Sequence, residues 1–343
     1  MPDPSHVLVT GGAGYIGAHT AKALSEAGYI PVTFDNLSSG FEEAVRWGPL
    51  VRGDIRDADA LFQTLADYRI QAVIHFAGLI EVGRSSIRPD LFYDVNVGGT
   101  ASLLAAMRRA GASRLVFSSS AAVYGQSPEP TLREDAPKNP ASPYGDTKLA
   151  GERMIAAHCK AFGLQAIALR YFNAAGADPS GLIGEAHFPE THLIPLAIAA
   201  ALGVGKPLTV FGQDFPTPDG TCLRDYIHVN DLASAHVKAL EAPVGESGFE
   251  AMNVGTGQGR SVMQVLEAVG EAVGRPAPHS IGGRRDGDPA ALVADPAKAG
   301  ERLGWSAQHS SLRNIVETAA SWARRPLYGH DAHQADAALE QLA

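Results

Sequence analysis

Short apolar runs alternate with amphipathic stretches over the first 180 residues of the chain. The apolar runs are rich in Val and Ile and are bounded by Gly, Asp or Ser, which predicts buried strands. We expect strands at 6–12, 30–35, 50–55, 71–78, 114–120 and 164–172, and helices at 15–28, 57–68, roughly 88–110 and 143–162. Strands that are apolar on both faces and alternate with helices are typical of a doubly wound parallel sheet.

The rhythm breaks after residue 175, where the chain becomes rich in Gly, Pro and polar residues. The later elements that the pattern indicates are an apolar run at 193–202, a strand at 251–255 and helices at 261–273 and 311–324. We therefore expect an α/β protein with a dinucleotide-binding domain and a smaller α/β substrate-binding domain. The predicted boundaries are 1–175 with returning segments near 226–256 for the first domain, 176–225 and 257–325 for the second, and 326–343 for a tail.

Composition excludes several classes of protein. The 343 residues are 45% hydrophobic and 19% charged, which is typical of a globular protein longer than most single cores. The net charge is −9 without a basic run, so we expect no nucleic-acid partner. We find no signal peptide and no apolar run of about twenty residues, so we expect no membrane partner. Cys159 and Cys222 fit no disulfide or metal spacing, which favours a reducing cytoplasm.

A glycine-rich turn follows the first strand in VLVTGGAGYIG (7–17). Gly11, Gly14 and Gly17 would let the chain turn tightly and let a pyrophosphate approach the start of the next helix. Asp35 ends the second strand, where a carboxylate accepts hydrogen bonds from the ribose hydroxyls and repels a 2′-phosphate. The arrangement predicts NAD rather than NADP.

Polar or small residues also end the third and fourth strands. Asp54 follows the third strand and is a candidate acceptor for the adenine amino group, while Phe76, Ala77 and Gly78 would leave room for the cofactor. Each of these, taken alone, is more often simply a strand end. Asn96 lies in a helical pattern that it does not favour, so a buried bridge between helix and loop is at least as expected as a direct role in catalysis.

Tyr144 and Lys148 lie four residues apart in SPYGDTK (142–148). Ser142 and Pro143 predict a helix start, so the two side chains should share one face of its first turns. To act as a base near neutrality, the tyrosine must have its pKa lowered by about three, which corresponds to roughly 4 kcal/mol. A nearby ammonium and a positive nicotinamide ring would supply such a shift.

The fifth strand ends in three serines, in RLVFSSSAAVYG (114–125). This is the sheet edge at which a cofactor ring would lie. Ser120 is the candidate that orients the reacting hydroxyl. A Y-x-x-x-K pair alone is weak evidence, but its combination with Ser120, Asp35 and the glycine turn in this order strongly indicates a dehydrogenase-type site.

Motifs along the chain read, in order, TGGAGYIG, DNLSSG, GDIRD, HFAG, SSSAAVYG, SPYGDTK, LRYFNAAGA, FGQDFPTPDGTCLRDYIHV and RRDGDPA. From about residue 6 to residue 324 they resemble the extended short-chain dehydrogenase/reductase family, and within it the UDP-galactose (UDP-glucose) 4-epimerases. The resemblance implies a Rossmann-type sheet, tightly bound NAD, a UDP-sugar substrate and a homodimer. It also implies further cofactor contacts from Tyr15, Ile16, Asn36, Ser39, Gly40, Ile55 and Tyr171.

The resemblance further implies a mechanism. Tyr144 would take the proton from the sugar C4 hydroxyl while hydride passes to NAD+. The 4-keto sugar would then rotate to present its other face, and hydride and proton would return. Ser120 would bond the C4 oxygen, and Lys148 would bind the nicotinamide ribose and lower the pKa of Tyr144. The substrate contacts implied for the second domain are Asn173, Leu193, Phe211, Arg224, Arg285 and Asp288. Surface solvation of the arginines and core packing of Phe211 are the alternatives.

Three positions depart from the family pattern. Ile80 replaces a lysine that touches the cofactor phosphates, and Leu292 stands where the residue that limits sugar size is found. His192 occupies an asparagine position, so it is a sugar-pocket candidate or an ordinary loop histidine. His187 and His192 do not form a convincing metal pair, and we predict no metal site.

Related activities remain alternatives. Sugar-nucleotide dehydratases and the UDP-xylose-forming decarboxylase need acidic groups beside the site serine, where this chain has Ala121 and Ala122. UDP-pentose and UDP-N-acetylhexosamine 4-epimerases share the catalytic residues, so the sequence leaves them open. A non-catalytic NAD-binding regulator is the most remote alternative, because Tyr144 and Lys148 are both present.

Overall fold

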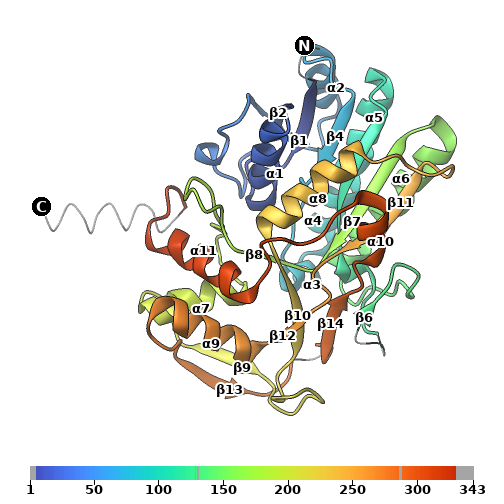
Figure 1. Ribbon diagram of the computed structural model, residues 1–343. Coiled ribbons are helices and arrows are strands. Elements are labelled where there is room, and N and C mark those ends of the chain that lie inside the picture. The colour runs from blue at the N-terminus through green and yellow to red at the C-terminus, as the bar shows by residue number, and fades with distance from the viewer. Residues whose placement is uncertain (1–4, 128, 130, 286–287, 330–343) are drawn as a thin grey trace, which may run out of the picture.

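The computed structural model describes residues 5–127, 129, 131–285 and 288–329. Its centre is a seven-stranded sheet in the order β11-β7-β5-β4-β1-β2-β3, in which all neighbours are parallel (Figure 1). The strands are β1 (His6–Thr10), β2 (Ile30–Asp35), β3 (Leu50–Arg52), β4 (Ala72–His75), β5 (Arg114–Ser120), β7 (Gln165–Tyr171) and β11 (Phe249–Val254). Six strands follow the apolar runs predicted in the first 180 residues, and β11 overlaps the strand predicted at 251–255.

Successive side chains of β1 enter opposite cores. Leu8 belongs to the core that α2 (Ala58–Asp67), α5 (Gly99–Ala110) and α6 (Pro143–Phe162) build on one face. Val7 and Val9 belong to the core that α1 (Tyr15–Glu26), α8 (Val229–Glu241) and α10 (Ala297–Leu303) build on the other. Alternating side chains that are all buried require cover on both faces, so the expectation of a doubly covered sheet is confirmed.

The single helix predicted near 88–110 is wrong in detail. The chain forms α3 (Val82–Ile87), α4 (Pro89–Phe92), a π-helical turn η2 (Tyr93–Gly98) and α5. Proline lacks a backbone donor and starts helices readily, which fits the break before Pro89. A π-helical turn inserts an extra residue and commonly marks a functional position, and this one contains Asn96.

A second group of elements lies below the large sheet in the view of Figure 1. Its apolar core joins α7 (Leu193–Leu202), α9 (Val262–Val273) and α11 (Leu312–Arg324). One small sheet has the order β12-β10-β14-β6, with β8 also paired to β10, and a further pair is β13-β9. The bounds are β6 (Thr131–Leu132), β8 (Asn173–Ala175), β9 (Leu208–Phe211), β10 (Leu223–His228), β12 (Gly259–Ser261), β13 (His279–Gly282), β14 (Ala291–Ala294), and the 3-10 turns η1 (Glu42–Ala44) and η3 (Ala121–Val123).

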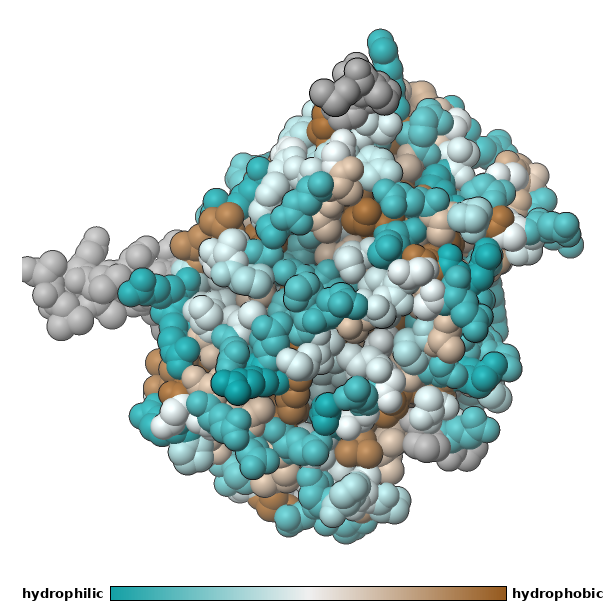
Figure 2. All heavy atoms as spheres, viewed as in Figure 1, coloured by the Kyte–Doolittle hydropathy of each residue, from teal (hydrophilic) through white to brown (hydrophobic). Residues whose placement is uncertain are grey.

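The predicted tail falls mostly on residues 330–343, which lie outside the described residues. Within the described part of the chain, each helix is too short or too polar to cross a membrane. Figure 2 shows hydrophobic residues scattered in small groups among hydrophilic ones on the face it presents.

Candidate active site

The glycine-rich turn joins β1 to α1 at the carboxyl edge of the sheet. Gly11 has φ +71°, and a Cβ there would lie 2.6 Å from the backbone nitrogen of Ala77. A Cβ on Gly17 would lie 2.2 Å from the Gly11 carbonyl oxygen. Gly14 begins α1 without a side-chain cap, and Ile16 packs into the core behind it. The helix N-terminus therefore stands open beside a closely packed turn, which suits a dinucleotide pyrophosphate.

Asp35 ends β2 next to that turn. Its carboxylate accepts hydrogen bonds from the backbone nitrogens of Ala13, at 3.0 Å, and Leu37, at 2.8 Å. These bonds fix the carboxylate between the turn and Gly40, whose Cβ would lie 2.8 Å from the Ala13 backbone. Burial raises the pKa of Asp35 and the two backbone bonds oppose the rise. The held carboxylate fits the predicted contact with a ribose diol.

The Asp54 carboxylate, predicted to accept from the adenine amino group, already accepts hydrogen bonds from other side chains. Arg56 donates to both of its carboxylate oxygens, at 2.8 and 2.7 Å, and Asn36 donates to one at 3.2 Å. The Arg56 guanidinium holds the pKa of Asp54 well below its usual range. Ile55 is buried in the core against Gly99. Any cofactor contact of Asp54 must therefore share the carboxylate with Arg56.

Tyr15 joins the turn to the chain that follows β8. Its hydroxyl donates to the Gly176 carbonyl oxygen over 2.6 Å, and its ring meets the His187 ring edge-on with centroids 6.1 Å apart. A small hollow lined by Gly14, Tyr15, Ser39 and His187, among others, opens there. These residues therefore surround the space above the glycine turn.

Asn96 bridges the end of β4 to α6. Its carboxamide accepts from the Leu79 nitrogen at 2.7 Å and donates to the Leu79 carbonyl and to the Thr147 hydroxyl. A Cβ on Gly78 would lie 2.9 Å from the Asn96 side-chain oxygen. Phe76 packs against the core that α1, α8 and α10 build. The bridging alternative for Asn96 is thus the one that its contacts favour.

Three predicted reaction residues meet where β5 ends. Lys148 donates to the Ser118 carbonyl oxygen over 2.8 Å, and its ammonium lies 5.9 Å from the centre of the Tyr144 ring. Ser120, the last residue of β5, is near enough to influence the ionisation of Tyr144. On β7, Tyr171 shares a 2.6 Å hydrogen bond with the Ser118 hydroxyl. The site thus places a phenol, a hydroxyl and an ammonium at the carboxyl edge of the sheet.

Burial disfavours the charged forms of both Tyr144 and Lys148. It raises the pKa of Tyr144, and the contact with Ser120 only partly opposes the rise. It also lowers the pKa of Lys148 to about 8. Charged forms are disfavoured away from water, so the protein's own groups do not produce the lowered tyrosine pKa. That lowering stays a prediction, and it depends on the positive ring of bound NAD+.

The predicted substrate residues form a second group around β10 and β14. Arg285 lies 4.9 Å from the centre of the Phe211 ring and forms a 2.8 Å ion pair with Asp288. Arg224 lies 3.6 Å from the other oxygen of Asp288 and is paired in register with Leu292. Two guanidinium groups beside an exposed aromatic ring form a chemically suitable site for a nucleoside diphosphate.

Asn173 and Asp225 connect this group to the large sheet. The Asn173 amide donates to the Asp225 carbonyl oxygen over 2.9 Å. The Asp225 carboxylate is fully buried and accepts from backbone nitrogens of Thr256, Gly257 and Ala294. Sequence reasoning missed Asp225, for which the only signal was its place inside the LRDYIH motif. It positions β10 and, with it, the neighbouring Arg224.

His192 is engaged by carboxylates. Its ring Nδ1 lies 2.8 Å from Glu190 and 3.0 Å from Glu185. Burial would lower the pKa of His192, but these two partners outweigh it and raise the pKa well above its usual value. The next residue, Leu193, begins α7 and packs against the apolar core that α7 shares with α9 and α11. A sugar contact for His192 would therefore have to use its other ring nitrogen.

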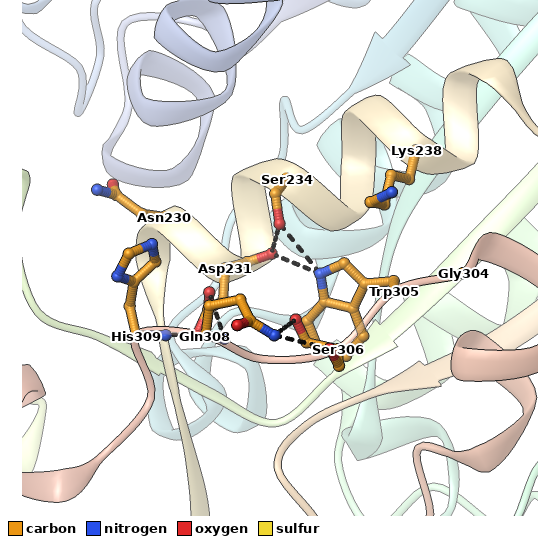
Figure 3. A pocket seen from close by; sticks show the side chains of 9 residues that line it. All are labelled: Asn230, Asp231, Ser234, Lys238, Gly304, Trp305, Ser306, Gln308 and His309. Carbon is orange, nitrogen blue, oxygen red and sulfur yellow. Dashed lines mark hydrogen bonds between the residues drawn. The ribbon is translucent and has the colours of Figure 1, made fainter.

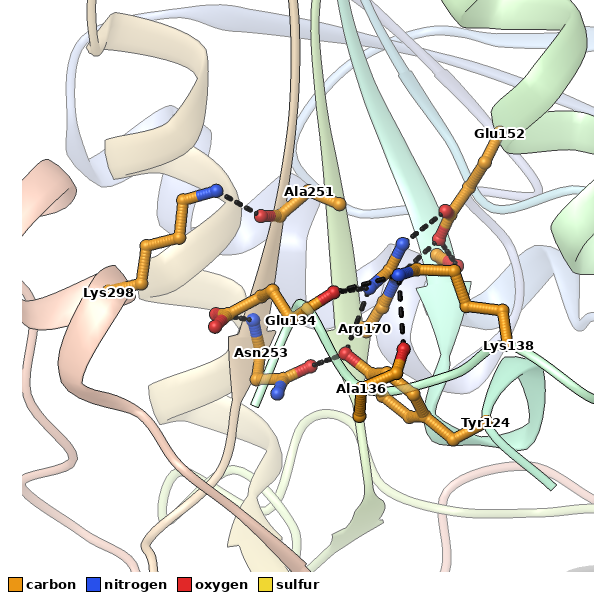
Figure 4. A network of polar contacts seen from close by, with 10 residues as sticks. Tyr124, Glu134, Ala136, Lys138, Glu152, Arg170, Ala251, Asn253 and Lys298 are labelled. Carbon is orange, nitrogen blue, oxygen red and sulfur yellow. Dashed lines mark hydrogen bonds and ion pairs between the residues drawn. The ribbon is translucent and has the colours of Figure 1, made fainter. Parts of the chain in front are cut away.

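A buried polar network supports the reaction residues (Figure 4). Arg170 forms two bonds with Glu152, at 2.8 and 2.6 Å, and Ser119 donates to the same carboxylate at 2.6 Å. The Tyr124 hydroxyl joins Arg170 to Asn253. The network ties β5, α6, β7 and β11 together directly behind Ser120 and Lys148. Sequence reasoning missed it, since only the topology brings these residues together.

A separate hollow lies away from these residues. It has a volume of about 300 Å³ and opens between α8 and residues 304–309 (Figure 3). Trp305 donates to Ser234 at 3.0 Å, and Asp231 accepts from the His309 nitrogen at 2.8 Å. None of the predicted site residues lines it, and its internal bonds hold the segment after α10 against α8.

Comparison with known proteins agrees with this geometry. A model of the NAD dependent epimerase/dehydratase family matches residues 7–255. The UDP-glucose 4-epimerase of Rhizobium leguminosarum bv. trifolii is 50% identical over 316 residues, covering 92% of this chain and 96% of that protein.

Two solved structures are similar over nearly the whole chain. The UDP-glucose 4-epimerase from Brucella ovis in complex with NAD has a TM-score of 0.90 at 50% identity, covering 93% of this chain and 98% of that one. The enzyme from Bifidobacterium longum in complex with NAD+ and UDP has a TM-score of 0.88 at 38% identity, with the same coverage. The predicted fold class and cofactor are thereby confirmed. The chain belongs to the NAD dependent epimerase/dehydratase family.

Proposed function

We propose that this protein inverts the configuration at C4 of a UDP-sugar and that it interconverts UDP-galactose and UDP-glucose. The observation that carries the proposal is the meeting of Ser120, Tyr144 and Lys148 at the sheet edge that also holds the glycine turn. The Arg224, Arg285 and Phe211 group adds a place for the nucleotide. Proteins that are 50% identical over most of their length are UDP-glucose 4-epimerases.

In the proposed reaction, Tyr144 takes the proton of the C4 hydroxyl as that carbon loses hydride. NAD+, held by the glycine turn and Asp35, would supply the reversible redox chemistry at C4. Ser120 donates a hydrogen bond to the C4 oxygen and keeps it aimed at Tyr144. Lys148 adds positive charge beside the phenol, which favours the phenolate. Tyr144 then gives its proton back to the C4 oxygen, so the net change is stereochemical only.

Between the loss and the return of hydride, the 4-keto sugar must rotate and present its other face without leaving the site. We propose that Arg224 and Arg285 hold its diphosphate, since guanidinium groups bind phosphate oxygens in a bidentate manner. Phe211 would pack against the uracil and Asp288 would accept from the uridine ribose. A tethered nucleotide leaves the sugar free to rotate about the diphosphate. We propose that residues 176–225 and 257–325, apart from α10, which packs on the large sheet, form this substrate-binding part.

Elimination of water is disfavoured by the residues next to Ser120. Ala121 and Ala122 form the turn η3, and Ala121 is buried. Alanine carries no proton that could be transferred, so the acid needed to expel a sugar hydroxyl is missing at these positions. Leu292, the position expected to limit sugar size, packs with Tyr124, Leu132 and Leu149.

We further propose that the protein is a cytoplasmic homodimer. Two cysteines that fit no paired framework support the first part of this statement, and the family resemblance supports the second. Light scattering of the purified protein would measure the mass of the particle. A mass near 36 kDa, the mass of one chain, would refute the dimer.

Product analysis by NMR tests the proposed reaction. The purified protein, without added cofactor, is incubated separately with UDP-galactose, UDP-N-acetylgalactosamine and UDP-xylose. We expect UDP-glucose from the first and the fastest turnover with it. Tyr144→Phe should lower kcat by at least about 100-fold while keeping NAD. Tyr29→Phe, at a hydroxyl that contacts Glu241, is the matched control and should keep full activity.

Two outcomes would contradict the proposal. Conversion by Tyr144→Phe at the wild-type rate would remove Tyr144 from its role as the base. A complete lack of UDP-galactose conversion, even after NAD+ is added, would leave the fold standing and remove the activity.

A further inference from the structure

Four potential metal ligands gather in the segment between β8 and α7. They are Glu185, His187, Glu190 and His192, and one ligand atom from each lies within 4.8 Å of the others. The sequence showed only two histidines five residues apart and predicted no metal site. Folding adds the two carboxylates, which complete a mixed imidazole and carboxylate set.

The spacing of the ligand atoms fits a single ion. Glu185 Oε1 lies 3.1 Å from His187 Nδ1 and 3.0 Å from His192 Nδ1. Glu190 lies 2.8 Å from His192 Nδ1 through one oxygen and 3.9 Å from His187 Nδ1 through the other. A tetrahedral ion with bonds of about 2.0–2.1 Å has ligand atoms about 3.3–3.4 Å apart. The four separations, two of which use different Glu190 oxygens, lie on both sides of that value. One ligand atom from each residue also lies within 4.8 Å of the others, so modest shifts would bring four ligand atoms to one centre.

The protein holds the carboxylate of Glu190 and the backbone of Glu185 in place. Glu190 Oε1 accepts from the backbone nitrogens of Thr191 and His192, each at 2.7 Å. The Glu185 side chain is only 8% exposed, and its carbonyl oxygen accepts from the Trp322 ring at 2.8 Å. Ligands fixed by such supporting bonds bind metal more tightly than free surface groups.

We propose that Glu185, His187, Glu190 and His192 bind one divalent transition-metal ion of the zinc class. Imidazole ligands favour Zn²⁺, Co²⁺ or Ni²⁺ over Mg²⁺ and Ca²⁺, which prefer oxygen ligands alone. Two carboxylates and two neutral imidazoles also balance a charge of +2. The ion would be structural, because the four ligands come from one segment and none is a reaction residue.

The position of the cluster indicates what the ion would do. The His187 ring packs edge-on against Tyr15, the first residue of α1, with centroids 6.1 Å apart. Closing the segment 185–192 around an ion would fix His187 against the start of that helix. The rival account is a protonated His192 that simply bridges Glu185 and Glu190. It needs no ion and predicts that none binds.

Metal binding to the intact, cofactor-containing protein separates the two accounts. After removal of metal with a chelator, the wild type is titrated by equilibrium dialysis with Zn²⁺ and, in parallel, with Mg²⁺. We expect one Zn²⁺ per chain, no Mg²⁺ at matched concentration, and a visible absorption band when Co²⁺ takes the site. The melting temperature should rise with Zn²⁺, since the folded state alone presents the full set.

Variants locate the ion. Glu185→Gln and His187→Gln should each weaken Zn²⁺ binding by at least about tenfold, since loss of a ligand exceeds loss of a supporting bond. His279→Gln changes an exposed histidine on β13 and should leave binding unchanged. The pair His330→Gln and His333→Gln tests the two histidines that lie outside the described residues. Their loss should also leave binding unchanged.

The proposal fails if the wild type binds well under one equivalent of Zn²⁺, a result that does not depend on any variant folding. It also fails if Glu185→Gln and His187→Gln, with circular dichroism and NAD content equal to the wild type, bind Zn²⁺ as tightly as it does. A loss of binding in the His330 and His333 pair alone would place the ion on the tail and overturn the assignment. None of these readouts depends on epimerase activity.

Discussion

The buried pair of Arg170 and Glu152 offers the sharpest test of what holds the site together. Figure 4 shows the guanidinium and the carboxylate facing each other between β7 and α6. Both side chains are only 4% exposed. Replacing Arg170 by methionine would leave the Glu152 carboxylate in the interior with only the Ser119 hydroxyl as a named partner. An unpaired buried charge is strongly unfavourable.

The expected cost follows from that geometry. Breaking one partner of a buried ion pair costs about 3–5 kcal/mol. Unfolding entropy is about 2.1 cal/mol/K per residue, so the 343-residue chain has about 0.7 kcal/mol per degree. Arg170→Met should therefore lower the melting temperature by about 4–7 °C. Part of the loss also comes from the Tyr124 hydroxyl, which Arg170 contacts at 2.9 Å.

A double variant separates charge from packing. Replacing both Arg170 and Glu152 by methionine leaves no buried charge, so it should recover at least about half of the loss. Arg313→Met is the matched surface control, because Arg313 and Glu317 form an exposed pair of the same kind. It should not shift the melting temperature measurably. All variants are compared by calorimetry at equal NAD content.

One pattern would refute this reasoning. If Arg170→Met and the double variant lost the same stability, the unpaired Glu152 charge would not be the cause. A loss below about 1 kcal/mol in the single variant would mean that water reaches the carboxylate and compensates it.

Three further results are expected. Burial lowers the pKa of Lys148 to about 8, so its ammonium is present below that pH and lost above it, and a pH–rate profile should show kcat falling as pH rises through about 8. Gly17→Ala would place a Cβ 2.2 Å from the Gly11 oxygen and should abolish NAD retention in a cofactor assay. Arg285→Leu should weaken UDP binding about tenfold or more in calorimetry, whereas Arg284→Leu should not, because Arg284 pairs with Asp214 instead.

Elements with local sequence signals were predicted well. The helix expected at 143–162 begins after Ser142, whose hydroxyl accepts from the Gly145 nitrogen, and ends before Gly163 at φ +74°. A cap, a first-turn proline and a terminal glycine are chemical features of neighbouring residues. The glycine turn is of the same kind. Such features can be seen before any tertiary contact is known.

Elements that depend on partners far away in the sequence were not predicted well. The helix α8, which the pattern did not predict, begins after His228, an uncommon cap residue, and packs against α1, which is far away in the sequence. The short strand β14 is stabilised by pairing with β10 and β6, which are far away in the sequence. Long-range pairing, which a local pattern does not contain, decides these two features. The partners of Asp54 and His192, Arg56 and Glu185, are near in the sequence, but the pattern does not show that their side chains point toward each other.

The opposed pKa shifts at the reaction site suggest how one residue can serve in both halves of the proposed reaction. Burial raises the pKa of Tyr144, so near neutrality the phenol keeps its proton unless positive charge is added beside it. Oxidised nicotinamide is positive and reduced nicotinamide is neutral. We therefore expect Tyr144 to act as a base only while NAD+ is bound and to return to its protonated form once C4 has been oxidised. The same burial that opposes ionisation then keeps the proton on Tyr144 until the C4 oxygen takes it in the return step.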